Sequence, residues 1–289
     1  ARENRRIANA LREGGLPMKK TALCLTLLAL VAGSAADALA QGMPTTQPKF
    51  MHVFREQIKP GRSGEHAKWE SGWPAAYEKA KSPYHYIALQ SITGPSEVWY
   101  VVPLANQAAY GDMIAAEDKD PALAAELDRL NKGDAEFRAE ETALQAVARP
   151  DLSHGAFPAP GKMKYYEITT FRIRPGHEVA WMAATKAYKA VMARSAANAG
   201  WRTYEVVAGA PGGTFLIFSS VGAFADFDRM MAEGDTAMKG ATPEEMGVLG
   251  KFMKESVLNV STNRYRLDPG QSYVNAETKA MDPAFWAKK

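Results

Sequence analysis

Residues 170–177 read TFRIRPGH, and residues 55–62 read REQIKPGR. Each stretch is rich in strand-forming residues and ends in a basic residue, a proline and a glycine, a combination typical of a turn that follows a strand. Pro60 and Pro175 lie 115 positions apart. The repeated phrase indicates that the chain contains the same structural unit twice.

Other residues match at the same offset, without a gap, for about 50 positions: Trp73 aligns with Tyr188, Tyr86 with Trp201 and Gly94 with Gly209. In each unit the hydrophobic period predicts a strand, a helix, two strands, a helix and a strand. The predicted strands span residues 50–58, 84–93, 97–103 and 142–149, then 164–173, 201–208, 214–218 and 257–267. The predicted helices span residues 63–81 and 106–139, then 176–198 and 222–254.

This βαββαβ order is the ferredoxin-like arrangement, which has helices on one face of its sheet and leaves the other face to be covered. The second copy of the unit is the simplest candidate to cover the open sheet face of the first. We therefore expect an α+β fold in which two ferredoxin-like βαββαβ repeats pack sheet to sheet as an α/β-barrel-like pseudo-dimer. The expected boundaries are repeat 1 at 49–149, a linker at 150–162, repeat 2 at 163–267 and an extended or poorly ordered tail at 268–289.

The N-terminal region has the pattern of a secretory leader. Met18 is followed by two lysines, an apolar run and the small residues Ala38 and Ala40 in an Ala-x-Ala arrangement. We expect a signal peptide at 18–40, cleavage before Gln41, and a segment at 1–17 that is non-native or mis-assigned. The expected location is periplasmic or secreted, with no membrane attachment after cleavage.

Charge and cysteine content exclude several classes of function. Residues 1–40 hold six of the 35 basic and three of the 32 acidic residues, so residues 41–289 carry 29 of each. No nucleic-acid partner is expected from this neutral balance. Cys24, the one cysteine, lies in the predicted leader, which excludes disulfides and thiolate sites from the rest of the chain. Zinc-protease, hydrolase-elbow and phosphate-loop motifs are absent.

His52 is the leading candidate for chemistry. It shares a strand face with Phe54 and Glu56, and its counterpart at the offset of 115 is Glu167. A histidine and a carboxylate related by a pseudo-twofold axis could meet across the sheet interface, as a catalytic base or an axial ligand. The alternative is a structural, hydrogen-bonded histidine. His66 is expected to pack in the core, because its counterpart is Trp181.

Four residues on the second strand of each unit are candidates for ligand binding. Tyr86 and Gln90 share one strand face, and their counterparts Trp201 and Glu205 share the equivalent face. Polar residues within buried strands need hydrogen-bond partners or water, and a lined pocket would supply them. An exposed sheet face would satisfy them equally. No metal ligands are expected.

The second unit resembles the NIPSNAP-like branch of the dimeric α/β-barrel superfamily over YEITTFRIRPG, residues 166–176. Thr169 stands where that group has an arginine, and the first unit departs further from its pattern. The resemblance implies a fold shared by cofactor-free oxygenases, haem-handling enzymes and proteins of unassigned activity. Their sites lie between sheet and helices or between the two sheets.

Two functions remain open from the sequence. The first is a secreted or periplasmic protein that binds a small apolar or aromatic molecule without a cofactor. The alternative is a cofactor-independent monooxygenase or a haem-linked enzyme of the dimeric α/β-barrel type. The sequence leaves open whether the chain is an enzyme. It is expected to be a monomeric pseudo-dimer or a homodimer.

Overall fold

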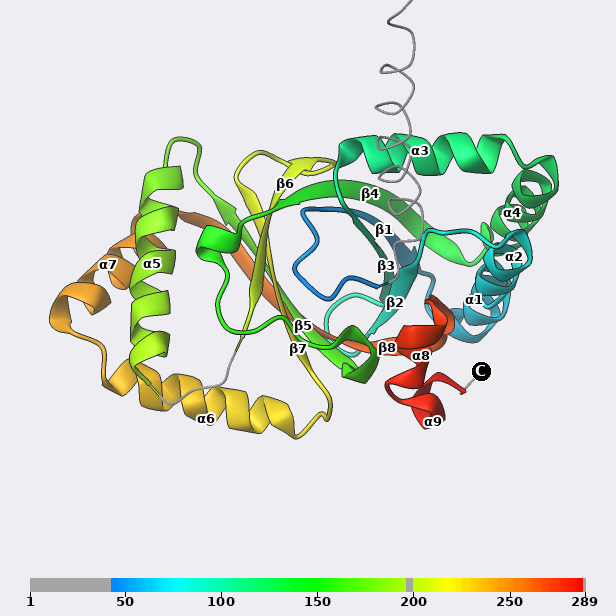
Figure 1. Ribbon diagram of the computed structural model, residues 1–289. Coiled ribbons are helices and arrows are strands. Elements are labelled where there is room, and N and C mark those ends of the chain that lie inside the picture. Colours follow the sequence, from blue (N-terminus) through cyan, green and yellow to red (C-terminus); the bar gives the residue numbers. More distant parts are fainter. Residues whose placement is uncertain (1–42, 196–199, 288–289) are drawn as a thin grey trace, which may run out of the picture. The chain divides into compact units, whose positions relative to one another are not determined.

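The computed structural model describes residues 43–195 and 200–287, and the predicted leader lies outside the described residues. Its strands form one closed barrel in the order β1-β3-β2-β8-β5-β7-β6-β4, with all neighbours antiparallel (Figure 1). The first half contributes β1 (Phe50–Ile58), β2 (Tyr86–Ser91), β3 (Glu97–Leu104) and β4 (Arg138–Ala148). The second half contributes β5 (Tyr165–Ile173), β6 (Arg202–Ala208), β7 (Thr214–Val221) and β8 (Val257–Tyr273).

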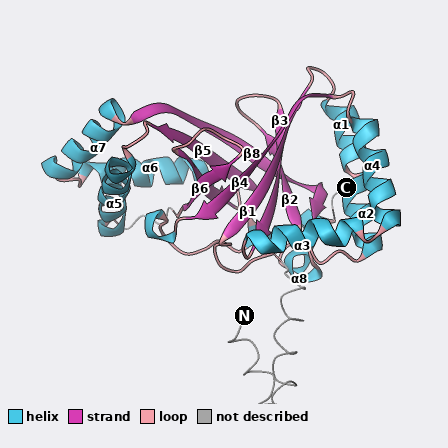
Figure 2. Cartoon of the chain, turned by 90° about the horizontal axis from the view of Figure 1, so that it is seen from above, coloured by secondary structure: helices cyan, strands magenta, loops and turns pink. Residues whose placement is uncertain are grey.

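Helices flank the barrel on two sides. Those of the first half are α1 (Ser63–Glu70), α2 (Gly72–Ala80), α3 (Gln107–Asp118) and α4 (Pro121–Asp134). Those of the second half are α5 (Glu178–Arg194), α6 (Asp226–Lys239) and α7 (Pro243–Glu255). Figures 1 and 2 show α1 to α4 on one side of the strands and α5 to α7 on the other. Each half therefore has its own space between strands and helices.

Alternation along the strands separates an inner from an outer barrel face. Met51 and Val53 belong to the interior core, together with residues from all the strands, among them Leu89, Trp99, Leu144, Ile168, Tyr204, Leu216 and Tyr265. Phe50 and its alternate neighbours on β1 take the opposite face, toward the helices. Side chains fill the inside of an eight-stranded barrel, and His52 and Glu56, which alternate with Met51 and Val53, lie outside it.

The two halves join edge to edge. The strand order stays the same when β1 to β4 are exchanged with β5 to β8, and the halves meet where β2 pairs with β8 and β4 pairs with β6. The sequence predicted an α/β-barrel-like fold made of two sheets that pack on each other. The barrel is observed, and its two sheets join by backbone pairing along both seams, so the described strands leave no unpaired sheet edge.

The repeated Pro-Gly phrase has a conformational cause. Gly61 and Gly176 have φ angles of 78° and 84°. Positive φ values of this size place a Cβ too close to the backbone, so glycine is the residue that adopts them without strain. Both glycines turn the chain from the first strand of their half toward its first helix.

The C-terminal segment corrects one prediction. We expected an extended or poorly ordered tail from Asp268, whereas β8 continues to Tyr273 and is followed by α8 (Ala276–Ala280) and α9 (Pro283–Trp286). Trp286 is buried in the barrel-interior core, and its Nε1 donates a hydrogen bond to the Gly161 carbonyl at 3.0 Å. The segment closes against the predicted linker, which itself carries the short helices Pro150–Leu152 and Pro160–Lys162.

Candidate functional site

The first half encloses a cavity of about 350 Å³ between the outer face of its strands and its helices. Seven aromatic residues line it, together with several charged and aliphatic side chains. The rings come from β1 to β3, α2, α3 and the loop before β2, and belong to Phe54, Trp73, Tyr77, Tyr84, Tyr86, Tyr100 and Tyr110. Such a wall suits a flat, largely apolar molecule.

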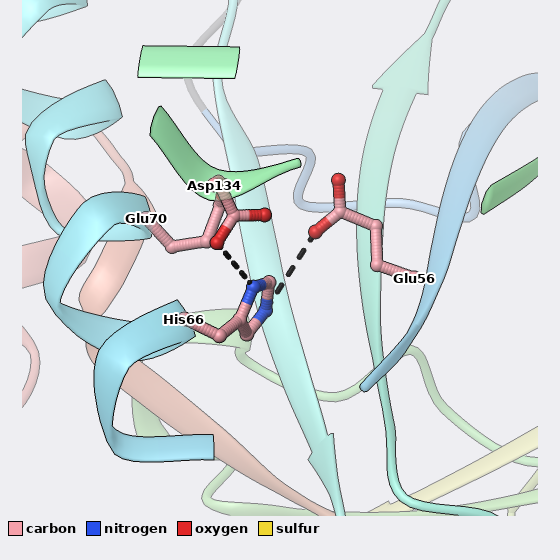
Figure 3. Close-up of side chains that lie close together, drawn as sticks. All are labelled: Glu56, His66, Glu70 and Asp134. Atoms are coloured by element: carbon pink, nitrogen blue, oxygen red, sulfur yellow. Dashed lines mark hydrogen bonds and ion pairs between the residues drawn. The ribbon is translucent and has the colours of Figure 1, made fainter. Parts of the chain in front are cut away.

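A group of buried ionisable side chains lies beside this cavity. Glu56, His66, Glu70 and Asp134, here called the acid–histidine cluster, have ligand atoms within 4.8 Å of one another (Figure 3). Their exposed fractions lie between 0% and 7%. Glu56 and Glu70 also line the cavity, so the cluster forms part of its wall.

Three separate elements bring the acid–histidine cluster together. His66 and Glu70 are four residues apart on α1, which places them on the same helix face. Glu56 points outward from β1 because it alternates with the inward-facing residues of that strand. Asp134 is the last residue of α4. No short motif contains all four residues, and the packing of α1 and α4 on β1 assembles them.

His66 occupies the centre of the cluster. Its Nδ1 lies 2.8 Å from Asp134 Oδ1, and its Nε2 lies 3.6 Å from Glu56 Oε2. The Tyr100 hydroxyl is 3.5 Å from Nε2. In Figure 3 the imidazole stands between the two carboxylates, with Glu70 on the Asp134 side.

Arg138, at the start of β4, supplies positive charge from outside the cluster. Its Nη1 donates to Glu56 Oε1 at 2.9 Å, and its Nε lies 3.2 Å from Asp134 Oδ2. Arg138 thus takes one oxygen of each of these carboxylates and leaves Glu56 Oε2 and Asp134 Oδ1 directed at the histidine.

Burial dominates the acid–base properties of Glu56 and Glu70. It raises the pKa of Glu56 to about 7, against the opposing effects of His66 and Arg138. Burial also raises the pKa of Glu70 well above its usual range, and the nearby Glu56 and Asp134 carboxylates raise it further. Burial therefore outweighs the opposing effects of His66 and Arg138 at Glu56, and both glutamates hold a proton more readily than an exposed glutamate does.

The second half has different residues at the equivalent places. At the offset of 115, Glu56 corresponds to Phe171, His66 to Trp181 and Glu70 to Thr185. The Phe171 and Trp181 rings lie 5.1 Å apart between centroids with a tilt of 46°, and both lie near the Phe252 ring. The second half thus folds without an acid–histidine cluster. Folding alone therefore does not explain why the first half has one.

The structure does not bring His52 and Glu167 together. His52 stacks on Tyr110 at 4.2 Å, with its Nε2 3.3 Å from the Tyr110 hydroxyl, and burial lowers its pKa to about 4. Glu167 accepts a hydrogen bond from Arg264 Nε at 3.0 Å and lines the second-half cavity. Both residues lie on the outer barrel face, beside different groups of helices, so the predicted meeting across the sheet interface was wrong.

The four predicted ligand-binding residues divide into two pairs. Tyr86 lines the first-half cavity, and Trp201 lines the second-half cavity, where its Nε1 donates to the Leu152 carbonyl at 2.9 Å. Gln90 accepts from Arg266 Nε and Glu205 from Arg149 Nη1, both at 2.8 Å. These two contacts lie along the seams between the halves, and neither residue lines a described cavity.

The sequence did identify His66 as buried but assigned it to the core. The signal that was available is the spacing of His66 and Glu70, two ionisable residues on the apolar face of a helix whose counterpart carries Trp181 and Thr185. Asp134 had no such signal, because its neighbours along the chain are exposed helix residues. Its approach to His66 depends on tertiary packing.

Two further cavities accompany this one. A cavity of about 580 Å³ lies over the second half and is lined by aromatic residues and by five methionines, Met192, Met230, Met231, Met238 and Met253. A third, of about 510 Å³, lies at one end of the barrel and includes Met51, Tyr166 and Arg202. Neither contains the acid–histidine cluster.

Among the described helices, none is long and apolar enough to cross a membrane.

No protein-family model matches the chain, and no curated protein sequence matches it. Solved structures do show similarity. An anthrone oxidase-like protein aligns with a TM-score of 0.50 and 12% identity, over 78% of this chain and 94% of that one. A "putative monooxygenase" from Lactobacillus acidophilus NCFM aligns with a TM-score of 0.47 and 9% identity, over 78% and 98%.

A chlorite dismutase variant from Candidatus Nitrospira defluvii aligns with a TM-score of 0.47 and 8% identity, over 78% of this chain and 93% of that one. At these identities the similarity concerns the fold alone. The similarity to the anthrone oxidase-like protein, together with the closed antiparallel barrel and its outer helices, supports the dimeric α/β-barrel fold.

Proposed function

We propose that the chain is an enzyme that binds a small aromatic molecule in the first-half cavity and acts on it with the acid–histidine cluster. The observation that carries this proposal is the contrast between the halves. The first half places four buried ionisable residues beside an aromatic cavity, whereas the second half has Phe171, Trp181 and Thr185 at three of the equivalent positions. Buried charge is costly and needs a compensating role.

The cavity wall also indicates the substrate class. The Tyr86 hydroxyl and the Trp73 indole Nε1 are buried, and neither has a hydrogen-bond partner among the described residues. Burial raises the pKa of Tyr86 well above its usual range, so its hydroxyl keeps its proton and remains a donor. A ligand with an oxygen acceptor, such as a phenol or an aromatic ketone, would satisfy both donors.

The reaction we propose is activation of that oxygen-bearing group by the acid–histidine cluster, followed by oxidation. Anthrone, an enolisable aromatic ketone, is a suitable probe, since one solved structure of similar fold is an anthrone oxidase-like protein. Anthrone and O₂ give anthraquinone and water, so the reaction balances without a further reductant. This is the oxygenase alternative that the sequence left open.

A haem-linked reaction is not part of the proposal. The cluster offers three carboxylates around a single imidazole, with ligand atoms within 4.8 Å of one another. Haem iron in proteins is held by histidine, cysteine, methionine or tyrosine, with the porphyrin plane beside the ligand. Carboxylate oxygens lie 2.8 Å and 3.6 Å from the two ring nitrogens of His66, which does not resemble the surroundings of a haem-ligating histidine.

A matched pair of variants tests the proposal. Glu70→Gln removes a carboxylate from the cluster, and Thr185→Ala changes the equivalent position in the second half. We expect Glu70→Gln to lower anthrone or naphthol turnover, measured as O₂ uptake, by about 100-fold or more, because an acid–base group contributes 10² to 10⁴ in rate. Thr185→Ala should leave turnover unchanged. Equal turnover in both variants would refute the assignment.

The binding function predicted first from the sequence gives a different result. A binding protein would quench its tyrosine and tryptophan fluorescence on addition of naphthol but would consume no O₂.

We also propose that the two halves form a single-chain pseudo-dimer and that the protein is exported, as the Met18–Ala40 pattern predicts. The invariance of the strand order under exchange of the halves supports the pseudo-dimer.

A further inference from the structure

Two hydrogen-bond acceptors face each other inside the acid–histidine cluster. His66 Nδ1 lies 2.8 Å from Asp134 Oδ1, so we assign the imidazole proton to Nδ1. Nε2 then carries a lone pair, and it lies 3.6 Å from Glu56 Oε2. Glu56 Oε2 is buried and has no hydrogen-bond donor among the described residues. Two lone pairs at this separation repel each other unless a proton or a metal ion lies between them.

The neighbouring hydroxyl does not fill the gap. Tyr100 has one hydroxyl proton, and the Gln271 side-chain oxygen accepts it at 3.0 Å, whereas His66 Nε2 is 3.5 Å away. Arg138 reaches the opposite oxygen of Glu56, Oε1, and does not contact Oε2 within hydrogen-bond distance. The space between Glu56 Oε2 and His66 Nε2 therefore lacks a donor.

The charges of the cluster lead to the same conclusion. Three buried carboxylates, Glu56, Glu70 and Asp134, share the single guanidinium of Arg138. Uncompensated buried charge is unfavourable by several kcal/mol per ion. Protons on the carboxyls reduce this charge, and a divalent cation that displaces them would compensate the two carboxylate charges that the single charge of Arg138 leaves unbalanced.

We infer that Glu56, His66 and Glu70 bind a divalent first-row transition-metal ion such as Mn²⁺, Fe²⁺ or Zn²⁺. One imidazole combined with carboxylates is a donor set of this class. Asp134 would act from behind His66, holding the ring through Nδ1 while Nε2 faces the ion, which is the usual carboxylate–histidine–metal arrangement. Glu56 and Glu70 line the cavity, so the open coordination positions would face it.

Only the role of the ion rests on the proposed function. In that role the ion would hold the oxygen of the bound aromatic molecule. Metal binding itself is measurable without any substrate. The experiment uses the full chain, stripped with a chelator and titrated with Co²⁺, whose visible d–d absorption reports the ligand set, and with Mn²⁺ and Zn²⁺ by calorimetry.

We expect one ion per chain, and at least 100-fold weaker binding in Glu56→Gln and His66→Gln. Glu97→Gln is the matched control, because Glu97 is a buried carboxylate outside the cluster and is bound by Arg55 and Tyr265. The Glu97→Gln variant should bind Co²⁺ as tightly as the wild type does. Circular dichroism establishes that each variant is folded, and the two cluster variants serve as independent tests.

The inference is overturned if the wild type takes up none of the three ions stoichiometrically, or if binding is unchanged in both cluster variants. If no ion binds while Glu70→Gln still abolishes turnover, the metal site fails and the proposed function stands. If the ion binds but turnover is absent, the metal site stands and the proposed function fails.

Discussion

At the scale of single residues, the position of a side chain on its strand decides what it can do. His52 and Glu56 are even-numbered neighbours of the inward-facing Met51 and Val53, so both point toward the helices. The sequence analysis recognised the shared face of His52 and Glu56 and assigned it to the sheet interface. The choice between the two faces depended on barrel closure, which local patterns do not contain.

His52 gives a residue-scale prediction about stability and pH. Burial between Phe54, Tyr110 and Gln145 lowers its pKa from 6.5 to about 4. The neutral ring therefore stabilises the fold fully above pH 6.5, and this contribution is lost as pH falls from 6.5 toward 4. At pH 5 the loss should be about 2 kcal/mol.

Urea unfolding of the wild type and of His52→Phe at pH 7.5 and pH 5 checks this. The phenyl ring keeps the stacking and cannot be protonated, so the stability of the wild type relative to the variant should fall by about 2 kcal/mol over that range. A difference that stays constant with pH would show that His52 is not the buried neutral group described here.

At the scale of elements, the strands and helices followed the sequence pattern closely, and the C-terminal segment did not. Most predicted strands agree with the observed ones to within a few residues, because strand propensity and turn glycines act locally. The segment after Asp268 follows the last predicted strand and has only short helices, so it resembled a tail. Its order comes from contacts with residues far away in the sequence, such as the bond from Trp286 to Gly161.

Trp286 tests whether this segment is part of the fold. It is 8% exposed and packs at the barrel interior. Trp286→Ala should lower the free energy of unfolding by about 3 kcal/mol or more, because a large buried side chain and its hydrogen bond are both lost. Val179→Ala, at a position 73% exposed, should change it by less than about 0.5 kcal/mol. Equal effects in urea unfolding would mean that the segment is a dispensable tail.

At the scale of the whole molecule, the two halves share a topology and differ in chemistry. Each contributes four strands and a cavity beneath its helices, yet only the first places the acid–histidine cluster there. The α/β-barrel fold class was predictable from the element order. The site was not, because its residues come from β1, α1 and α4 and meet only when these elements pack.

The assignment of function to the first-half cavity is tested most directly by crystals soaked with small phenols, naphthols and aromatic ketones. The account predicts electron density for these probes in the first-half cavity, with the probe oxygen within hydrogen-bond distance of Tyr86 or of the acid–histidine cluster. Density confined to the second-half cavity or to the end of the barrel, with the first-half cavity empty, would contradict it.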